Sequence, residues 1–220
     1  MPRRILFCLI LVLCISCSRS EPRIPFGFID LVYYPGRTGP VERFSFFVLA
    51  EDDDGIENLN ELKIYYERFG LEWVISSNEW VYLHDNGRHW IGSRAIAMTD
   101  NNILPRGQYK AVLINKAGDQ SERVFTFDAP ETPRFPFPVF SIHDGIYQVN
   151  SLYPENSFII YNQEGDIIGT TALANLHGNI TDLDLPSRTR HLALWAKDES
   201  LKTSALTEAL PLIESVSSLR

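Results

Sequence analysis

The residues of this chain that could carry covalent chemistry are its cysteines, and all three lie at its beginning. Cys8, Cys14 and Cys17 are followed by no further thiol in the 220-residue sequence. If the chain is processed before Cys17, no pair of thiols remains to form an intrachain disulfide. We therefore expect the body of the protein to be held together by burial of apolar side chains alone.

Residues 1–17 have the organisation of an export signal. Arg3 and Arg4 form a basic start, Ile5 to Ile15 form an apolar core, and the small residue Ser16 precedes Cys17. The apolar run is shorter than the roughly 20 residues that a membrane-spanning helix needs. The segment therefore predicts an exported protein with a signal peptide.

The end of this segment, Leu13-Cys14-Ile15-Ser16-Cys17, resembles a bacterial lipobox, and Cys14 in place of leucine resembles the spirochaete-type pattern. The resemblance implies a lipoprotein cut before Cys17, with lipidation (palmitate) of that cysteine and a membrane anchor in the cell envelope. Ser18, directly after the cysteine, resembles the pattern that sorts lipoproteins to the outer membrane. The pattern does not specify which face of that membrane the protein occupies. The alternative is an ordinary secretory signal with incidental cysteines.

The charge of the chain excludes one class of partner. Loss of Arg3 and Arg4 with the signal would lower the net charge from −8 to −10, so we expect no nucleic acid as a partner. An acidic body also gains nothing from an anionic membrane surface, so attachment would depend on the lipid. Hydrophobic residues make up 45% and aromatic residues 12% of the sequence, which is typical of a globular protein.

Motifs for catalysis are missing from the sequence. It has no Gly-x-Ser-x-Gly elbow, no phosphate-binding glycine loop and no His-Glu-x-x-His pair. We therefore expect a non-catalytic binding or spacer module without a cofactor. An enzyme that uses unrecognised carboxylates is the third-ranked alternative.

An acidic run at residues 51–54 invites a calcium interpretation. With Gly55 aligned to the glycine of an EF-hand loop, Asp52, Asp54 and Glu61 fall at ligand positions. Ala50 stands where the first aspartate belongs, so the loop lacks a full ligand set. We favour a turn in which aspartate side chains bond to nearby backbone groups.

A hairpin with histidines on both strands is predicted at residues 80–93. Asn86-Gly87 between two apolar-rich runs is a strong signal for a two-residue type I′ turn. His84 and His89 are then a directly opposed cross-strand pair. Two imidazoles could share a metal ion, but the spacing supplies no third ligand, so surface histidines are the favoured interpretation.

The same register divides the aromatic residues of the hairpin between two faces. Trp80, Tyr82, His84, His89 and Ile91 share one face, and Val81, Leu83 and Trp90 share the other. Since a sandwich has one inner face per sheet, one set should be exposed or covered by another element. The candidate binding surface for a protein or glycan partner is therefore Trp80, Tyr82, His84, His89 and Trp90. The alternative is packing against Trp73 or a second domain.

The elements that must hold these residues are strands. Residues 104–119 contain Gly107-Gln108-Tyr109 before an alternating run, and a last strand follows at residues 122–127. This pattern resembles the F and G strands of immunoglobulin-like and fibronectin type III-like domains. The resemblance implies a tyrosine corner at Tyr109, with its hydroxyl bonded to backbone upstream.

The fold class expected from these patterns is all-β, with two tandem immunoglobulin-like sandwiches. Four prolines between residues 129 and 138 predict a semi-rigid linker. Seven further strand candidates, among them residues 179–185 and 204–212, follow at sandwich-like spacing. The expected organisation is a signal peptide (1–17), a tether (18–25), a first sandwich (26–128), the linker (129–138), a smaller second sandwich (139–213) and a tail (214–220).

Overall fold

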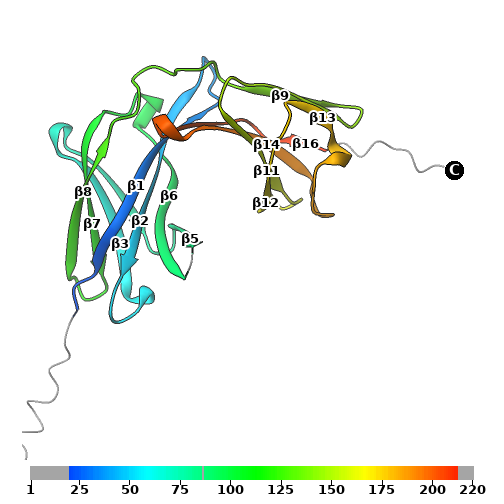
Figure 1. The fold of residues 1–220 in the computed structure, drawn as a ribbon. Helices are drawn as coiled ribbons and strands as arrows, with labels where there is room; N and C mark the ends of the chain where they lie inside the picture. The colour runs from blue at the N-terminus through cyan, green and yellow to red at the C-terminus, as the bar shows by residue number, and fades with distance from the viewer. Residues whose placement is uncertain (1–19, 86, 213–220) are drawn as a thin grey trace, which may run out of the picture.

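The computed structural model describes residues 20–85 and 87–212, without the side chains of His84 and Asp85 (Figure 1). Strands dominate this part of the chain, and its only helices are short 3-10 turns, so the all-β prediction is confirmed. The first eight strands are β1 (Arg23–Tyr34), β2 (Val41–Glu51), β3 (Leu59–Tyr66), β4 (Leu71–Ser76), β5 (Val81–Asp85), β6 (Arg88–Ile96), β7 (Gly107–Asn115) and β8 (Gln120–Phe127).

These eight strands form a first module of two facing sheets. One sheet has the order β1-β2-β6-β5, and the other has the order β4-β3-β7-β8. In chain order this corresponds to strands A, B, E and D facing C′, C, F and G, the arrangement of an immunoglobulin-like sandwich. Alternation along β2 sends Phe44, Phe46 and Val48 into the space between the sheets.

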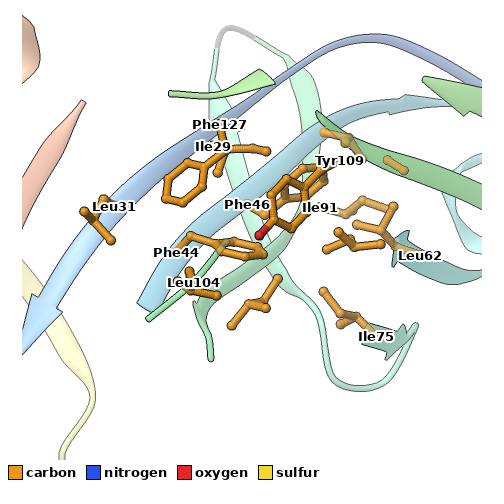
Figure 2. Packing of buried hydrophobic residues seen from close by; sticks show 14 of the residues in the cluster. Ile29, Leu31, Phe44, Phe46, Leu62, Ile75, Ile91, Leu104, Tyr109 and Phe127 are labelled. Carbon is orange, nitrogen blue, oxygen red and sulfur yellow. The ribbon is translucent and has the colours of Figure 1, made fainter. Parts of the chain in front are cut away.

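Tyr109 lies at the centre of this first core (Figure 2). Its ring is fully buried and meets Phe44 edge to face at 5.3 Å. Its hydroxyl donates a 2.7 Å hydrogen bond to the carbonyl of Pro105, four residues upstream. This is the geometry of a tyrosine corner, as the Gly-x-Tyr pattern predicts.

A second module contains β9 (Val139–His143), β10 (Ile146–Asn150), β11 (Glu155–Tyr161), β12 (Ile167–Ala172), β13 (His177–Asn179), β14 (His191–Asp198), β15 (Thr203–Leu206) and β16 (Leu210–Pro211). The sheet β13-β10-β9 faces β12-β11-β14-β15. This order matches that of the first module without its strand D. The second core contains Tyr147, Val149, Phe158, Ile160, Leu192 and Leu194.

Two strand predictions in the second module are wrong in their extent. Residues 179–185 are not a strand, because the chain leaves β13 at Asn179 and enters a 3-10 turn at Ile180–Asp182. The last strand is interrupted between β15 and β16. There the hydroxyl of Thr207 accepts a 2.9 Å hydrogen bond from the backbone N–H of Leu194, so a side chain replaces a strand partner.

One sheet continues from the first module into the second. β15 pairs in parallel with the end of β1, with Leu31 opposite Thr203 and Tyr33 opposite Ala205. This pairing joins the strands of both modules into a nine-stranded sheet. The N–H of Leu31 also donates to the carbonyl of Lys202 at 2.9 Å. The modules are therefore joined by main-chain hydrogen bonds as well as by the connecting segment.

The proline-rich segment packs against the modules that it connects, which differs from the expected spacer. The ring centroids of Phe135 and Tyr153 are 5.0 Å apart. Phe135, Phe137 and Tyr153 all contact the first core. Ala196 and Ala205 of the second module belong to the same cluster of buried residues. The resulting molecule is bent, with the second module projecting sideways from the end of the first (Figure 1).

The expected tether is also shorter than residues 18–25. β1 begins at Arg23, and Pro22 and Ile24 are already buried. Ser20 is tied to the first module because its carbonyl accepts a hydrogen bond from the side chain of Asn115. The predicted signal, Cys17 and the tail at residues 214–220 lie outside the described residues.

Candidate functional site

The predicted hairpin of aromatic residues forms with the expected register. Tyr82 pairs with Ile91, Leu83 with Trp90, and His84 with His89. However, the residues of the candidate binding surface do not lie on one exposed face. Trp80 and Ile91 point into the core, and Trp80 is only 6% exposed. Trp80 is therefore a core residue, and its assignment to the candidate binding surface is corrected.

Trp90 lies on the opposite, outer face of the sheet. Its ring is 5.7 Å from that of Phe28, which stacks on Phe47 at 5.5 Å. Strand pairing places Phe26, Leu49 and Trp90 in one row across β1, β2 and β6. Leu49 is almost fully buried although it points away from the core, because the partly exposed aromatic rings around it cover it.

This outer aromatic patch, defined here as Phe26, Phe28 and Trp90, is the best candidate for a contact surface on the first module. Phe26 is 57% exposed, whereas Phe28 and Trp90 are half-buried. Sequence analysis missed the two phenylalanines because they come from β1. Their distance from Trp90 along the chain hides the proximity that the pairing of β1, β2 and β6 creates.

The remaining residues of the candidate surface divide between edge and turn. Tyr82 is 46% exposed on the edge strand β5, with its ring 6.1 Å from that of Trp80. His89 is exposed beside the Asn86-Gly87 turn, and the side chain of His84 is outside the described part. Within residues 20–85 and 87–212, no group of three histidine, cysteine or acidic side chains is placed to hold a metal ion.

The acidic loop has the hydrogen bonds of a turn. Oδ1 of Asp52 accepts a 2.9 Å hydrogen bond from the backbone N–H of Asp54, and both carboxylate oxygens accept from the side chain of Asn58. Gly55 has a φ of 100°, which favours glycine. Glu61 lies on β3 and pairs with Lys63 at 3.5 Å, so the carboxylates of Asp52 and Glu61 are engaged in other contacts.

A buried ion pair that sequence analysis missed joins β2 to the β6–β7 connection. The guanidinium of Arg106 donates to both carboxylate oxygens of Glu42, each at 2.8 Å. It also donates to the carbonyls of Ala129 at 2.9 Å, Leu104 at 2.6 Å and Pro130 at 2.6 Å. All five donors of the guanidinium are thus used. The pair fastens the start of the connecting segment to the first module, which is a structural role.

An open groove of about 490 Å³ runs between β1 and β8. Arg123 lies along it and donates to the carbonyls of Ile24 and Pro25, and the ring of Phe125 fills the space beside Gly27. These contacts link β1 to β8, which belong to the two facing sheets of the first module.

No helix among the described residues is long and apolar enough to cross a membrane.

Comparisons with known proteins give no family. No protein-family model and no curated protein matches the sequence. Among solved structures, Tp47, the 47-kilodalton lipoprotein of Treponema pallidum, aligns with a TM-score of 0.37 and 10% identity, over 87% of this chain and 51% of that chain. This chain thus spans about half the length of Tp47.

Two other solved structures align with similar scores. Latent PorU of Porphyromonas gingivalis has a TM-score of 0.32 and 11% identity, over 90% of this chain and 20% of that one. A chain from the crystal structure of Dpr11 IG1 bound to DIP-gamma IG+IG2 has a TM-score of 0.26 and 12% identity, over 87% of this chain and 98% of that one. At these scores, the immunoglobulin-like assignment of the first module rests on its own strand order and on the Tyr109 hydrogen bond.

Proposed function

We propose that this protein is a lipid-anchored component of the cell envelope, in the outer membrane, whose two joined β modules act as a non-catalytic binding or spacer body. Cys17 carries the lipid in this proposal. The sequence of residues 1–17 motivates the anchor. The buried ion pair of Glu42 and Arg106 links segments of the first module, which fits a structural role for that module.

The observation that supports the proposal most is how closely the folded body follows Cys17. Ser20 already contacts the first module, and Pro22 is buried. Three residues of chain can span at most about 10 Å. A lipid on Cys17 would therefore hold the base of the first module next to the membrane surface. The shared sheet would then set the direction in which the second module projects.

Metabolic labelling with palmitate tests the anchor. We expect the full chain to incorporate label and to partition with membranes, and the Cys17→Ser variant to lose both properties. Cys14→Ser serves as the matched control and should retain label. An unlabelled wild-type protein, or label that persists in Cys17→Ser, would overturn the lipid anchor.

A second candidate function is recognition of a glycan, and the outer aromatic patch favours it. Aromatic rings at a surface provide large apolar contact area for a partner. On a glycan array, we expect binding that Trp90→Ala reduces. Trp80→Ala is unsuitable as a surface probe because that ring is buried. Binding to no sugar, or binding that survives both Trp90→Ala and Phe28→Ala, would remove this function.

A further inference from the structure

Four polar side chains gather on the uncovered face of the shared sheet, beside the junction of the modules. In β1 and β2, Tyr33 and Phe44 point into the first core, so their neighbours Tyr34 and Arg43 point to the other face. In β11, Ile160 points into the second core, so Tyr161 points to that same uncovered face. Arg94 comes from β6.

Contacts among these residues define the cluster. The guanidinium carbon of Arg43 lies 4.7 Å from the centroid of the Tyr34 ring, a cation–π distance. The hydroxyl of Tyr34 donates to the backbone carbonyl of Arg94 at 3.4 Å. Tyr34 thus holds the guanidinium of Arg43 against its ring and contacts the backbone of Arg94. Burial raises the pKa of Tyr34, and the positive charges of Arg43 and Arg94 oppose that rise.

Arg43 is incompletely satisfied. Its Nε is buried and has no hydrogen-bond partner. A buried donor without a partner costs about 1–3 kcal/mol. Since Nε itself is closed to solvent, an external anion would be bound by the terminal nitrogens of the guanidinium. A guanidinium presents its donors in a plane that matches the two oxygens of a carboxylate.

Neither arginine forms an ion pair in the described part of the chain. Among the described residues, no carboxylate oxygen lies within 4 Å of Arg43 or Arg94, although the chain has a net charge of −8. Arg23 and Arg106, by contrast, pair with Asp53 and Glu42. Two unpaired guanidinium groups in an acidic protein leave a local positive charge that could be matched by an external anion.

Tyr161 brings the second module to this cluster. Burial raises the pKa of Tyr161, and the positive charge of Arg94 opposes that rise. Four strands separate β11 from β6 in the shared sheet. Two side chains can interact across that distance only if the sheet curves toward this face. Tyr161 belongs to β11 of the second module, whereas Tyr34 and Arg43 belong to β1 and β2 of the first, so the cluster spans the junction at which the modules meet at an angle (Figure 1).

We propose that Arg43 and Arg94, with Tyr34 and Tyr161, bind the carboxylate of an acidic sugar in a glycan that lies along the uncovered face of the shared sheet. This inference rests on the glycan-binding form of the proposed function and names its substrate class. The outer aromatic patch on β1 and β6 continues the same face away from the junction.

A sugar fits this face better than an acidic peptide for a reason of hydrogen bonding. An extended peptide that binds a sheet usually pairs its backbone with an exposed edge strand. Tyr34 and Arg43 are side chains on a face, where β1 and β2 already pair with each other. A peptide lying there would leave its backbone N–H and C=O groups without strand partners.

Titration of the full chain in detergent with oligogalacturonate, followed by calorimetry, tests the proposal. We expect binding to oligogalacturonate and much weaker binding to a neutral galactose oligomer of equal length. Arg43→Gln and Arg94→Gln should each weaken binding about tenfold or more, since hydrogen bonds to charged groups contribute about 1.5–3 kcal/mol. Arg43→Lys should weaken it too, because an ammonium lacks the planar pair of donors.

Arg68→Gln is the matched control. Arg68 also lies near an aromatic ring, 5.6 Å from the centroid of Phe69, but on the 3-10 turn after β3. This variant should bind as the wild type does. If Arg43→Gln fails to fold, Arg94→Gln still tests the site, because Arg94 is exposed.

Each other outcome overturns a defined part of the inference. Neutral and acidic oligomers bound equally, with no effect of Arg94→Gln, would remove this site and leave glycan binding by the aromatic patch. Binding of neither oligomer would remove both the site and the glycan function. Tighter binding of polyglutamate or dextran sulfate than of oligogalacturonate would overturn the choice of a carboxylated sugar.

Discussion

Replacement of Arg106 by methionine should destabilise the first module strongly. Arg106 and Glu42 expose only 14% and 8% of their side chains. Methionine retains much of the apolar stem above the Phe127 ring, which lies 4.8 Å from the guanidinium carbon. It removes all five hydrogen bonds of the guanidinium, and so isolates their contribution.

The expected loss follows from what remains buried. Glu42 keeps one hydrogen bond, from the backbone N–H of Leu104 at 3.0 Å, but loses its counter-ion. Removing one partner of a buried ion pair costs about 3–5 kcal/mol. The carbonyls of Ala129 and Pro130 also lose their donor. We therefore expect the free energy of unfolding to fall by about 3–5 kcal/mol.

Urea unfolding of a double-mutant cycle provides the measurement, with circular dichroism and tryptophan fluorescence as separate probes. Glu42→Gln removes the charge alone, and Glu42→Gln/Arg106→Met should cost less than the two single losses together, by about 1–3 kcal/mol. Arg68→Met on the exposed 3-10 turn should stay within about 0.5 kcal/mol of the wild type. A loss below about 1 kcal/mol for Arg106→Met, or strict additivity in the cycle, would refute the reasoning.

Three further substitutions test other parts of the structure. Gly92→Ala should cost about 1–3 kcal/mol or more in urea unfolding, because its Cβ would lie 1.9 Å from the carbonyl oxygen of Phe46. Gly169→Ala, with only a 3.6 Å contact, should be tolerated, and equal losses would contradict the clash. Burial and a nearby carboxylate raise the pKa of Tyr33 to about 12, so thermal stability should fall as pH rises from about 10 to about 12. Tyr33→Phe should lessen that fall. A variant with the same pH profile as the wild type would contradict a contribution from Tyr33. Asp52→Ala should lower the free energy of unfolding by about 1 kcal/mol. Added calcium should leave the melting temperature of the wild type unchanged. A calcium-dependent rise that Asp52→Ala abolishes would support the metal interpretation instead.

Local patterns were enough to predict the β class and several contacts. Alternating residues in β2 predict its buried positions, and Asn86-Gly87 predicts the pairing of His84 with His89. The Gly-x-Tyr pattern predicts the bond from Tyr109 to Pro105, because that bond spans only four residues. Each of these features depends on neighbours in sequence, where turn geometry and side-chain alternation act directly.

Which face of the hairpin is buried could not be predicted, because register divides residues into faces without orienting them. The structure buries Trp80 and leaves Trp90 outside, beside Phe28 from a strand some sixty residues earlier. The places of Asp52 and Glu61 could not be predicted for a related reason. Asp52 meets Asn58 in a turn, whereas Glu61 is carried away on β3.

The sequence by itself determined most of the strands and the first core, since these arise from local periodicity. The export signal stays a prediction from the same kind of local pattern. Only the tertiary structure decided how the modules meet. The parallel pairing of Leu31 with Thr203, 172 positions apart, follows from no local pattern, and Leu31 shares one buried cluster with Tyr153 and Ala205 of the second module. That pairing joins the strands of both modules into one sheet and brings Tyr161 within range of the charge of Arg94, although no local pattern links these two residues along the chain.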